Sequence, residues 1–480
     1  MRRKGKRFLR IVSLWLSLVM LAGCGSKQTT QSETQTKFED MEQEQSYALS
    51  YDIAGGKDVM PIAGFYGPYP IRYSKDGCTM PDYITEEYFK LISEAGVNVI
   101  SASSLNYPSA PDLLIKTLEY GEKYGVGIYV TDDRVTANIG DDTYTAKAAS
   151  SLIADYYDYP AFCGLVLVDE PTWQPHYNAG DGSRDISLYG HLAEILREDL
   201  GIKFYNSMYS ILQWDDATRE AYKKYVQEIG RVINPNYVTC SFYPFSDVQP
   251  GGLPAYFFTL DLMRTQAQSK KVPFWSYIQA GSQWNDAQGR FDSKGYYPNE
   301  AEFNWNINTS LAFGAQGIGY FPLIQPYHFA YAESTDWDFQ RNGIIGAWGN
   351  KTRWYYYAQN ISKQIQAIDE VLMNAVNKGV IVNGAQAVED TGFAECIIKG
   401  GSFRELASVS GDAMVGCFNY NGKSAFYVVN YSMEYAQNIV LDFHGTQNMK
   451  VIQNAETNHI KTSELTLDMA AGEGVLLVIE

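Results

Sequence analysis

A repeat of short apolar runs, each followed by a stretch with helical spacing, constrains the fold of this chain more than any other feature. Several of the helical stretches stop at glycine, as at Gly96, Gly125 and Gly201, and glycine is common just after a helix C-terminus. Strand, helix, glycine and strand in succession indicate βαβ units and a parallel sheet. Eight such units predict a (β/α)8 barrel over residues 51–378. The eight apolar runs lie at 62–69, 97–104, 126–133, 164–171, 203–210, 237–245, 272–281 and 317–324.

A doubly wound open sheet is the alternative α/β arrangement. Such sheets commonly carry a glycine-rich phosphate loop after their first strand. The first run here continues as GFYGPYP, which lacks the GxGxxG form. This difference and the count of eight units favour the barrel.

The hydrophobic pattern of the sequence changes after residue 379. Short runs with period-two character, separated by Gly, Asn and Ser, replace the helical stretches. This pattern predicts an antiparallel β-sandwich over residues 379–480. Residues 354–374 are expected to form the last barrel helix before it.

Residues 1–24 have the three parts of an export signal. Six Lys and Arg residues come first, an apolar stretch follows, and Leu21-Ala22-Gly23-Cys24 ends it. The ending resembles the lipobox of bacterial lipoproteins. That resemblance implies a lipid anchor on Cys24, with fatty acids such as palmitate, and a location on the extracytoplasmic face of the cell membrane. The alternative is an ordinary signal peptide in which the cysteine is incidental. Residues 25–50 are polar and are expected to be a flexible tether.

The net charge argues against some partners. The chain carries a formal charge of −17, and loss of the six cationic residues of the signal takes this to −23 (−17 − 6). So acidic a chain is a poor partner for nucleic acid or an anionic polymer. Aromatic residues reach 14% of the chain, and flat rings suit the apolar faces of sugars. A neutral carbohydrate is therefore the expected partner.

In a (β/α)8 barrel the active site lies where the C-terminal ends of the strands meet. The fourth run reads GLVLVDEPTWQ and ends in Asp169 and Glu170, and the third ends near Asp132. We predict these three as catalytic carboxyls. Rings and polar side chains at the other strand ends are predicted to bind substrate: Tyr66, Trp173, Asn206, Tyr243, Trp275, Gln279, Trp284, Tyr320 and His328.

The runs GLVLVDEP, SFYPF, PFWSYIQAGSQW and LAFGAQGIGYF resemble the β-galactosidase/cellulase-like barrel glycoside hydrolases known as clan A. The resemblance implies that Glu170 is the acid/base, with Asp169 where the clan has Asn. It also implies a nucleophilic Glu on strand seven, but Gln279 stands at that position. Adjacent strand residues point to opposite faces unless the strand has ended or bulged, which weakens Asp169 as a partner for Glu170. The candidates for the second carboxylate are Asp132, Asp133, Asp169, Glu333 and Asp336.

Other chemistries have little support in the sequence. No GxSxG, Walker loop or HExxH occurs, and the five His show no metal-ligand spacing, so we expect no cofactor and no catalytic metal. Cys396 and Cys417 could pair, because the expected compartment permits disulfides. Three hypotheses follow: a membrane-anchored glycoside hydrolase, a glycan-binding lipoprotein on a barrel without its nucleophile, and a surface scaffold.

Overall fold

The computed structural model describes residues 59–73, 79–102, 105–180, 182–245, 250–283, 297–325, 340–341 and 343–480. The predicted signal, tether and lipidated Cys24 lie outside these residues, and so do Trp284, His328, Glu333 and Asp336. Over the described part of the chain, no helix has the length and apolar character needed to cross a membrane.

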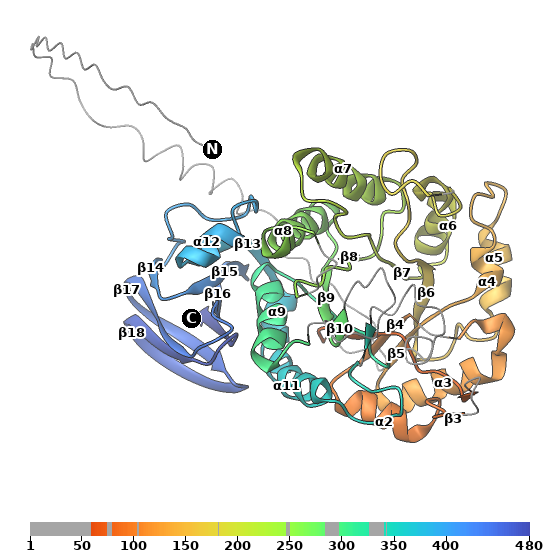
Figure 1. Cartoon of the computed structure of the whole chain (residues 1–480), viewed down its shortest axis with the longest axis horizontal. Helices are drawn as coiled ribbons and strands as arrows, with labels where there is room; N and C mark the ends of the chain where they lie inside the picture. Colours follow the sequence, from red (N-terminus) through yellow and green to blue (C-terminus); the bar gives the residue numbers. More distant parts are fainter. Residues whose placement is uncertain are drawn as a thin grey trace, which may run out of the picture. The chain divides into compact units, whose positions relative to one another are not determined.

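Eight parallel strands form the first sheet, as the eight apolar runs predicted (Figure 1). Their order is β7-β6-β5-β4-β1-β11-β9-β8. The edges β7 and β8 are joined through Met208, whose N–H donates to Thr239 O over 3.0 Å and whose carbonyl accepts from Ser241 N over 3.4 Å. The sheet thereby closes into a barrel. The strands are β1 (Ile62–Phe65), β4 (Val99–Ala102), β5 (Gly127–Val130), β6 (Phe162–Val168), β7 (Phe204–Asn206), β8 (Val238–Cys240), β9 (Phe274–Gln279) and β11 (Ile318–Phe321).

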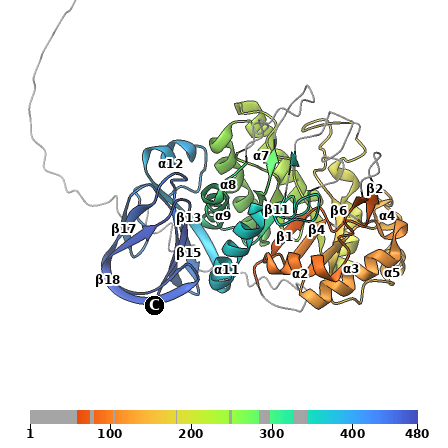
Figure 2. The same ribbon diagram turned by 60° about the horizontal axis from the view of Figure 1, so that its bottom comes forward.

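Helices surround the barrel (Figures 1 and 2). α9 starts at a capping box in which Asn299 and Glu302 satisfy each other's backbone N–H groups. The helices are α2 (Glu86–Glu94), α3 (Pro111–Tyr124), α4 (Asp133–Thr136), α5 (Ala146–Ile153), α6 (Gly190–Glu194), α7 (Asp216–Val232), α8 (Gly252–Lys270), α9 (Glu300–Ala312) and α11 (Arg353–Met373). Single turns are η1 (Tyr107–Ser109), η2 (Ile186–Leu188) and the π-helical η3 (Ile195–Asp199).

Aromatic rings fill the barrel interior. Trp275 stacks on Tyr237 with the ring centroids 3.9 Å apart. Two glycines make room for them, Gly319 in the neighbouring strand β11 and Gly317 just before it: a Cβ on Gly317 would come within 2.5 Å of the Trp275 ring, and one on Gly319 within 2.7 Å of the Tyr277 ring. The bulky rings on β9 and these glycines are thus complementary, as close packing requires.

The C-terminal region is an all-β domain with a core of its own. Its long strand β17 pairs with β14 through Val440–Phe443 and with β19 through Met449–Ile452, and its register shifts in between. This bend folds the antiparallel sheet into the predicted sandwich (Figure 2). Cys396 and Cys417 are both free thiols. The elements are β13 (Ala375–Asn383), α12 (Ala385–Asp390), β14 (Leu406–Ser410), β15 (Ala413–Tyr420), β16 (Lys423–Asn430), β17 (Gln437–Gln453), β18 (Glu456–Met469) and β19 (Gly474–Ile479).

Side chains from α9 join the barrel to this domain. Asn308 Nδ2 donates to Gly472 O over 2.8 Å, and Tyr427 Oη donates to Asn308 Oδ1 over 2.8 Å. β13 starts at Ala375, directly after α11 ends at Met373. Two short ribbons complete the described elements: β2 (Arg72–Tyr73) with β3 (Thr79–Met80), and β10 (Ser282–Gln283) with β12 (Gln340–Arg341).

Gly164 near the start of β6 is a position where we expect any side chain to be costly. Its φ is 151°, and a Cβ there would lie 2.1 Å from the backbone oxygen of Lys203. Gly164→Ala is expected to lower the free energy of unfolding by about 1–3 kcal/mol, because backbone must shift to relieve the clash. Gly201→Ala is the control, since φ is 64° there and nothing lies within 4 Å. Urea unfolding should show the larger loss for Gly164→Ala, and equal losses would contradict this packing.

Candidate active site

Two adjacent carboxyl side chains stand just beyond the fourth barrel strand. β6 ends at Val168, so Asp169 and Glu170 are no longer strand residues. Glu170 has a φ of 50°, and this left-handed backbone breaks the alternation of side chains between the two faces of a strand. Because the strand has ended, both carboxyls can face the same way.

Asp169 is held by hydroxyl groups at the end of β7. Tyr205 Oη donates to Asp169 Oδ1 over 3.2 Å, and Ser207 Oγ donates to the same oxygen. Ser207 Oγ also accepts the Glu170 backbone N–H over 3.1 Å. Tyr205 and Ser207 are two residues apart and so share the inward face. One serine thereby positions both acidic residues at the C-terminal ends of the strands, which we call the mouth.

Glu170 is placed to hold a proton. Burial raises the pKa of Glu170 to about 8, and the negative charge of Asp169 acts in the same direction. The positive charge of Arg184 and a hydrogen bond with Ser241 oppose this rise without cancelling it. A carboxyl whose pKa lies near the working pH is suited to general acid catalysis.

The two carboxyls share one proton unequally. Burial raises the pKa of Asp169 as well, but hydrogen bonds from Ser207 and Tyr205 and the charge of Arg184 favour its ionised form. Two negative charges so close together are costly. We therefore infer that the pair favours the anion on Asp169 and the proton on Glu170.

A group of four rings, Phe65, Tyr66, Tyr243 and Phe321, lies beside the carboxyl pair. Phe321 contacts Phe65 at 5.5 Å and Tyr66 at 5.5 Å, and stacks on Tyr243 at 5.2 Å between centroids. Burial, followed by the charges of Asp169 and Glu170, raises the pKa of Tyr66 to about 12. We call these rings the aromatic wall, because they give the mouth an apolar side next to its charge.

Two other predicted residues lie at this end of the barrel. Gln279 is the last residue of β9 and is buried, with Nε2 donating to Gly281 O over 3.2 Å. Trp173 lies on the loop after Glu170, partly exposed, with its ring 4.5 Å from that of His176. Of the predicted substrate contacts, Tyr66 and Tyr243 come together with the carboxyl pair.

The structure places three predicted substrate contacts away from the mouth. Tyr320 points outward and stacks on Phe303 of α9 at 5.6 Å. Asn206 is fully buried on the opposite face of β7 from Tyr205. Trp275 is buried near the start of β9, at the other end of the barrel interior. Each is packed inside the fold, so none is in position to touch a sugar.

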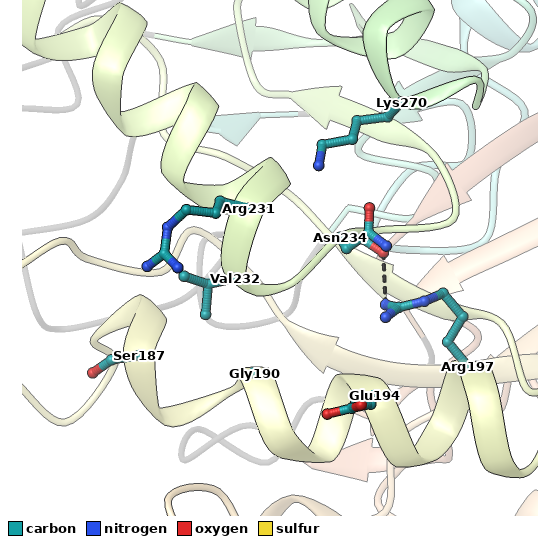
Figure 3. A pocket seen from close by; sticks show the side chains of 8 residues that line it. All are labelled: Ser187, Gly190, Glu194, Arg197, Arg231, Val232, Asn234 and Lys270. Atoms are coloured by element: carbon teal, nitrogen blue, oxygen red, sulfur yellow. Dashed lines mark hydrogen bonds between the residues drawn. The ribbon is translucent and has the colours of Figure 1, made fainter.

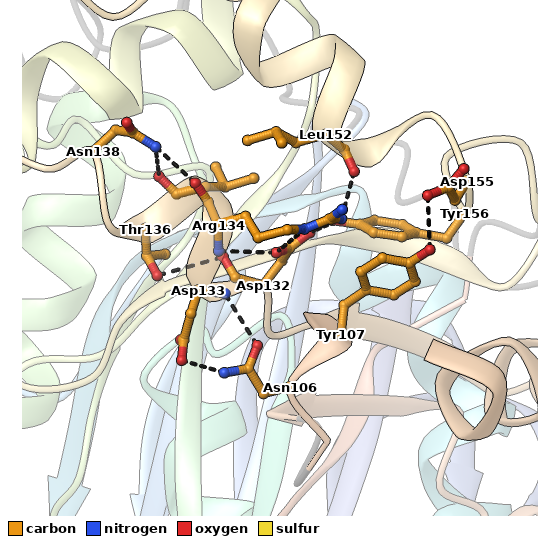
Figure 4. Close-up of polar contacts among 11 residues, drawn as sticks. Asn106, Tyr107, Asp132, Asp133, Arg134, Thr136, Asn138, Leu152, Asp155 and Tyr156 are labelled. Carbon is orange, nitrogen blue, oxygen red and sulfur yellow. Dashed lines mark hydrogen bonds and ion pairs between the residues drawn. The ribbon is translucent and has the colours of Figure 1, made fainter. Parts of the chain in front are cut away.

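Asp132 serves the fold at the end of β5 (Figure 4). It is buried, and its carboxylate accepts from Arg134 Nε over 3.0 Å, Arg134 Nη2 over 2.7 Å and Tyr156 Oη over 2.8 Å. It also caps α4 through the Arg134 backbone N–H. With its oxygens so occupied, Asp132 does not fit the role of second catalytic carboxylate. The exposed Asp133 next to it is bonded to Asn106.

Sequence reasoning missed Tyr205, Ser207, Ser241 and Arg184. A signal existed for the first two, because alternation places Tyr205 and Ser207 on the same face of the fifth strand. Ser241 begins the SFYPF run at the end of the sixth strand. Arg184 lies on a long loop after β6, and no pattern in the sequence links that loop to the carboxyl pair.

An open pocket of about 520 Å³ lies at the opposite end of the barrel (Figure 3). α7 ends at Val232 and α8 at Lys270, directly before strands β8 and β9 begin, which places the pocket at the N-terminal ends of the strands. It contains none of the predicted site residues. Its lining is Ser187, Gly190, Glu194, Arg197, Arg231, Val232, Asn234 and Lys270. Among the residues that the structure describes, no cluster of His, Cys, Asp or Glu could hold a metal ion.

No family model and no curated protein matches the chain. Several glycoside hydrolases of known structure have a similar fold. A catalytic mutant of Gan42B, a GH42 β-galactosidase from G. stearothermophilus, is 9% identical over 90% of this chain and 100% of its own, with a TM-score of 0.52. A β-galactosidase from Bacillus circulans sp. alkalophilus is 10% identical over 89% and 100%, with a TM-score of 0.49. One from Marinomonas ef1 is 10% identical, with a TM-score of 0.45, and the match spans 69% of this chain and 65% of that one. At such identity the likeness to the first shows the fold alone.

Proposed function

We propose that the chain is a glycoside hydrolase that acts on a neutral oligo- or polysaccharide, with Glu170 as its general acid and base. The observation that carries the proposal is the pair of adjacent carboxyls in the mouth beside an aromatic wall, with burial and the charge of Asp169 raising the pKa of Glu170. Cleavage of a glycosidic bond requires a proton for the leaving oxygen and an anion near the positively charged transition state. The pair supplies both.

The steps assigned to the residues follow from their positions. A sugar ring packs its apolar face on the aromatic wall, and Glu170 gives its proton to the glycosidic oxygen. As the bond breaks, positive charge develops at the anomeric carbon and is stabilised by the Asp169 carboxylate. Glu170 then takes a proton from the water that completes hydrolysis.

Turnover separates this proposal from the second candidate function. Gln279 at the end of β9 favours a glycan-binding protein without catalysis, because an amide cannot act as a carboxylate nucleophile. A panel of aryl glycosides and neutral oligosaccharides is to be assayed for release of phenol and reducing ends, with binding followed by calorimetry. We expect turnover of at least one sugar. Binding without turnover across the panel would show that the protein is a glycan-binding protein.

We further propose that the protein is anchored by lipid at Cys24 on the extracytoplasmic face of the membrane. The basic, apolar and Leu-Ala-Gly-Cys segments of residues 1–24 support this. Cells grown with an alkyne fatty acid should label the wild-type chain, and Cys24→Ala should remove the label and release the protein from the membrane fraction. Equal labelling of the two would contradict the anchor.

The raised pKa of Glu170 predicts an alkaline limit to activity. Only protonated Glu170 can act as the acid, so kcat/KM is expected to fall as the pH rises through about 8. The negative charge of Asp169 raises the pKa of Glu170. Asp169→Asn removes that charge, so the alkaline limit of kcat/KM should move to lower pH. Asp133→Asn, an exposed carboxyl outside the pair, is the control. A limb that stays in place in Asp169→Asn would show that another group titrates.

A further inference from the structure

The two mouth carboxyls stand on one side of any bound sugar. Asp169 and Glu170 are consecutive residues, with Cα atoms about 3.8 Å apart, and both follow β6. In the usual two-carboxylate mechanisms, the acid and its partner flank the anomeric carbon from opposite faces. Adjacent residues at one strand end do not flank it in this way.

The described strand ends offer no other carboxylate for the opposite face. Asp132 is bound by Arg134 and Tyr156, and Asp133 is bonded to Asn106. β9 ends in Gln279, whose amide is buried and bonded to Gly281. Among the described residues, no carboxylate is therefore in position to attack the anomeric carbon from that face.

We propose that the substrate supplies the nucleophile as a 2-acetamido group, so that the sugar is a β-linked N-acetylhexosamine; this rests on the proposed glycosidase function. The acetamido oxygen attacks the anomeric carbon as the bond to the leaving oxygen breaks. Glu170 gives its proton to the leaving glycosidic oxygen. A cyclic oxazolinium ion forms, with its N–H directed to Asp169.

Water then completes the reaction. It attacks the anomeric carbon and returns a proton to the Glu170 carboxylate, and the ring opens to regenerate the acetamido group. The acetamido oxygen reaches the anomeric carbon only from the face opposite the leaving group, so the bond must be 1,2-trans. For gluco- and galacto-configured sugars this is the β-anomer, and configuration is retained.

The surroundings of Asp169 suit this role. Two hydroxyl donors, Tyr205 and Ser207, fix its carboxylate at the inner edge of the mouth, where it can accept the amide N–H and stabilise positive charge. Phe65 lies 5.9 Å from Tyr205 between centroids, so the aromatic wall comes next to Asp169. The wall provides the apolar contacts that an acetamido methyl group needs.

Matched substrates test the inference with the full chain. 4-Nitrophenyl β-glycosides of N-acetylglucosamine and N-acetylgalactosamine are compared with those of glucose and galactose. The acetamido sugars are expected to have kcat/KM at least about 100-fold higher, because only they carry the nucleophile. The thiazoline formed from N-acetylglucosamine, a stable analogue of the cyclic intermediate, should be a competitive inhibitor. A trifluoroacetamido substrate, with a weaker nucleophile, should react at least about tenfold more slowly than the acetamido parent.

Asp169→Asn should lower kcat on the acetamido substrates by about 10²-fold or more, whereas Asp133→Asn should leave it unchanged. Rates on the 2-hydroxy sugars within tenfold of the acetamido sugars would overturn the inference and leave the glycosidase proposal standing. A covalent adduct from a 2-fluoro glycoside on any carboxylate, Glu333 and Asp336 included, would do the same. If no glycoside is hydrolysed and the thiazoline does not bind, the proposed function fails and the inference fails with it.

Discussion

Glu170→Gln is expected to reduce glycoside hydrolysis by about 10²–10⁴-fold, the contribution of a positioned acid. Glutamine keeps the shape of the protonated side chain and can preserve its hydrogen bond with Ser241, but it has no proton to give to the leaving oxygen. Aryl glycosides with poor leaving groups should show the largest losses, because they depend most on that proton. The measurement is kcat/KM across a leaving-group series for the substrate that the panel identifies.

The stability of Glu170→Gln shows whether its loss of activity comes from the missing proton donor or from unfolding. The folded pKa of Glu170 is raised from 4.5 to about 8, so the neutral form stabilises the fold below pH 4.5 and that contribution is lost as the pH rises through 8. Glutamine is always neutral, so Glu170→Gln should gain stability relative to wild type at pH 8 and not at pH 4. Glu194→Gln, in the pocket at the opposite end of the barrel, is the control and should keep full activity. An unchanged rate in a folded Glu170→Gln protein would remove Glu170 from the mechanism.

Asp132→Ala is expected to lower the free energy of unfolding by about 3 kcal/mol, as loss of one partner of a buried ion pair does. It leaves the Arg134 guanidinium, the Tyr156 hydroxyl and the first turn of α4 without their acceptor. At temperatures where the variant is folded, kcat per folded molecule should stay close to wild type. Denaturant unfolding and active-site titration give the two quantities.

Asp133→Ala provides the comparison for Asp132. It removes an exposed carboxylate from the next residue, and exposed polar pairs contribute about 0–1 kcal/mol. A loss of activity in Asp132→Ala without a loss of stability would assign Asp132 to the chemistry. Equal stability of the two variants would show that the buried network does not hold this end of β5.

The barrel and sandwich were predictable because their evidence is periodic. The apolar runs that became β1, β4 and β5 are buried strands in the order that the sequence predicted. The position of Glu170 was predictable for the same reason, since it follows an uninterrupted apolar run at the fourth strand. Counting strands placed that end in the mouth without any side-chain detail.

The direction of side chains was much less predictable. Tyr320 lies one residue before Phe321, and alternation sends Phe321 into the mouth and Tyr320 toward Phe303 of α9. Trp275 lies on the inward face of β9, but it is near the N-terminal end of the strand, whereas Gln279 is at the C-terminal end. Glu170 departs from alternation through its left-handed φ, and nothing in the run VDEP fixes that angle. Asp132 is an acid at a strand end like Glu170, and its bonds to Arg134 and Tyr156 separate the two roles.

The central claim is that Glu170 is a neutral acid at pH 7 beside an ionised Asp169, and ¹³C NMR of glutamate carboxyls tests it most directly. The full chain is labelled at the glutamate side-chain carboxyl and titrated, and the Glu170→Gln spectrum is subtracted to identify the signal of Glu170. The account predicts one carboxyl that titrates with a midpoint near 8 and is missing from Glu170→Gln. Complete ionisation of every glutamate by about pH 6, within the ordinary range of the residue, would contradict it.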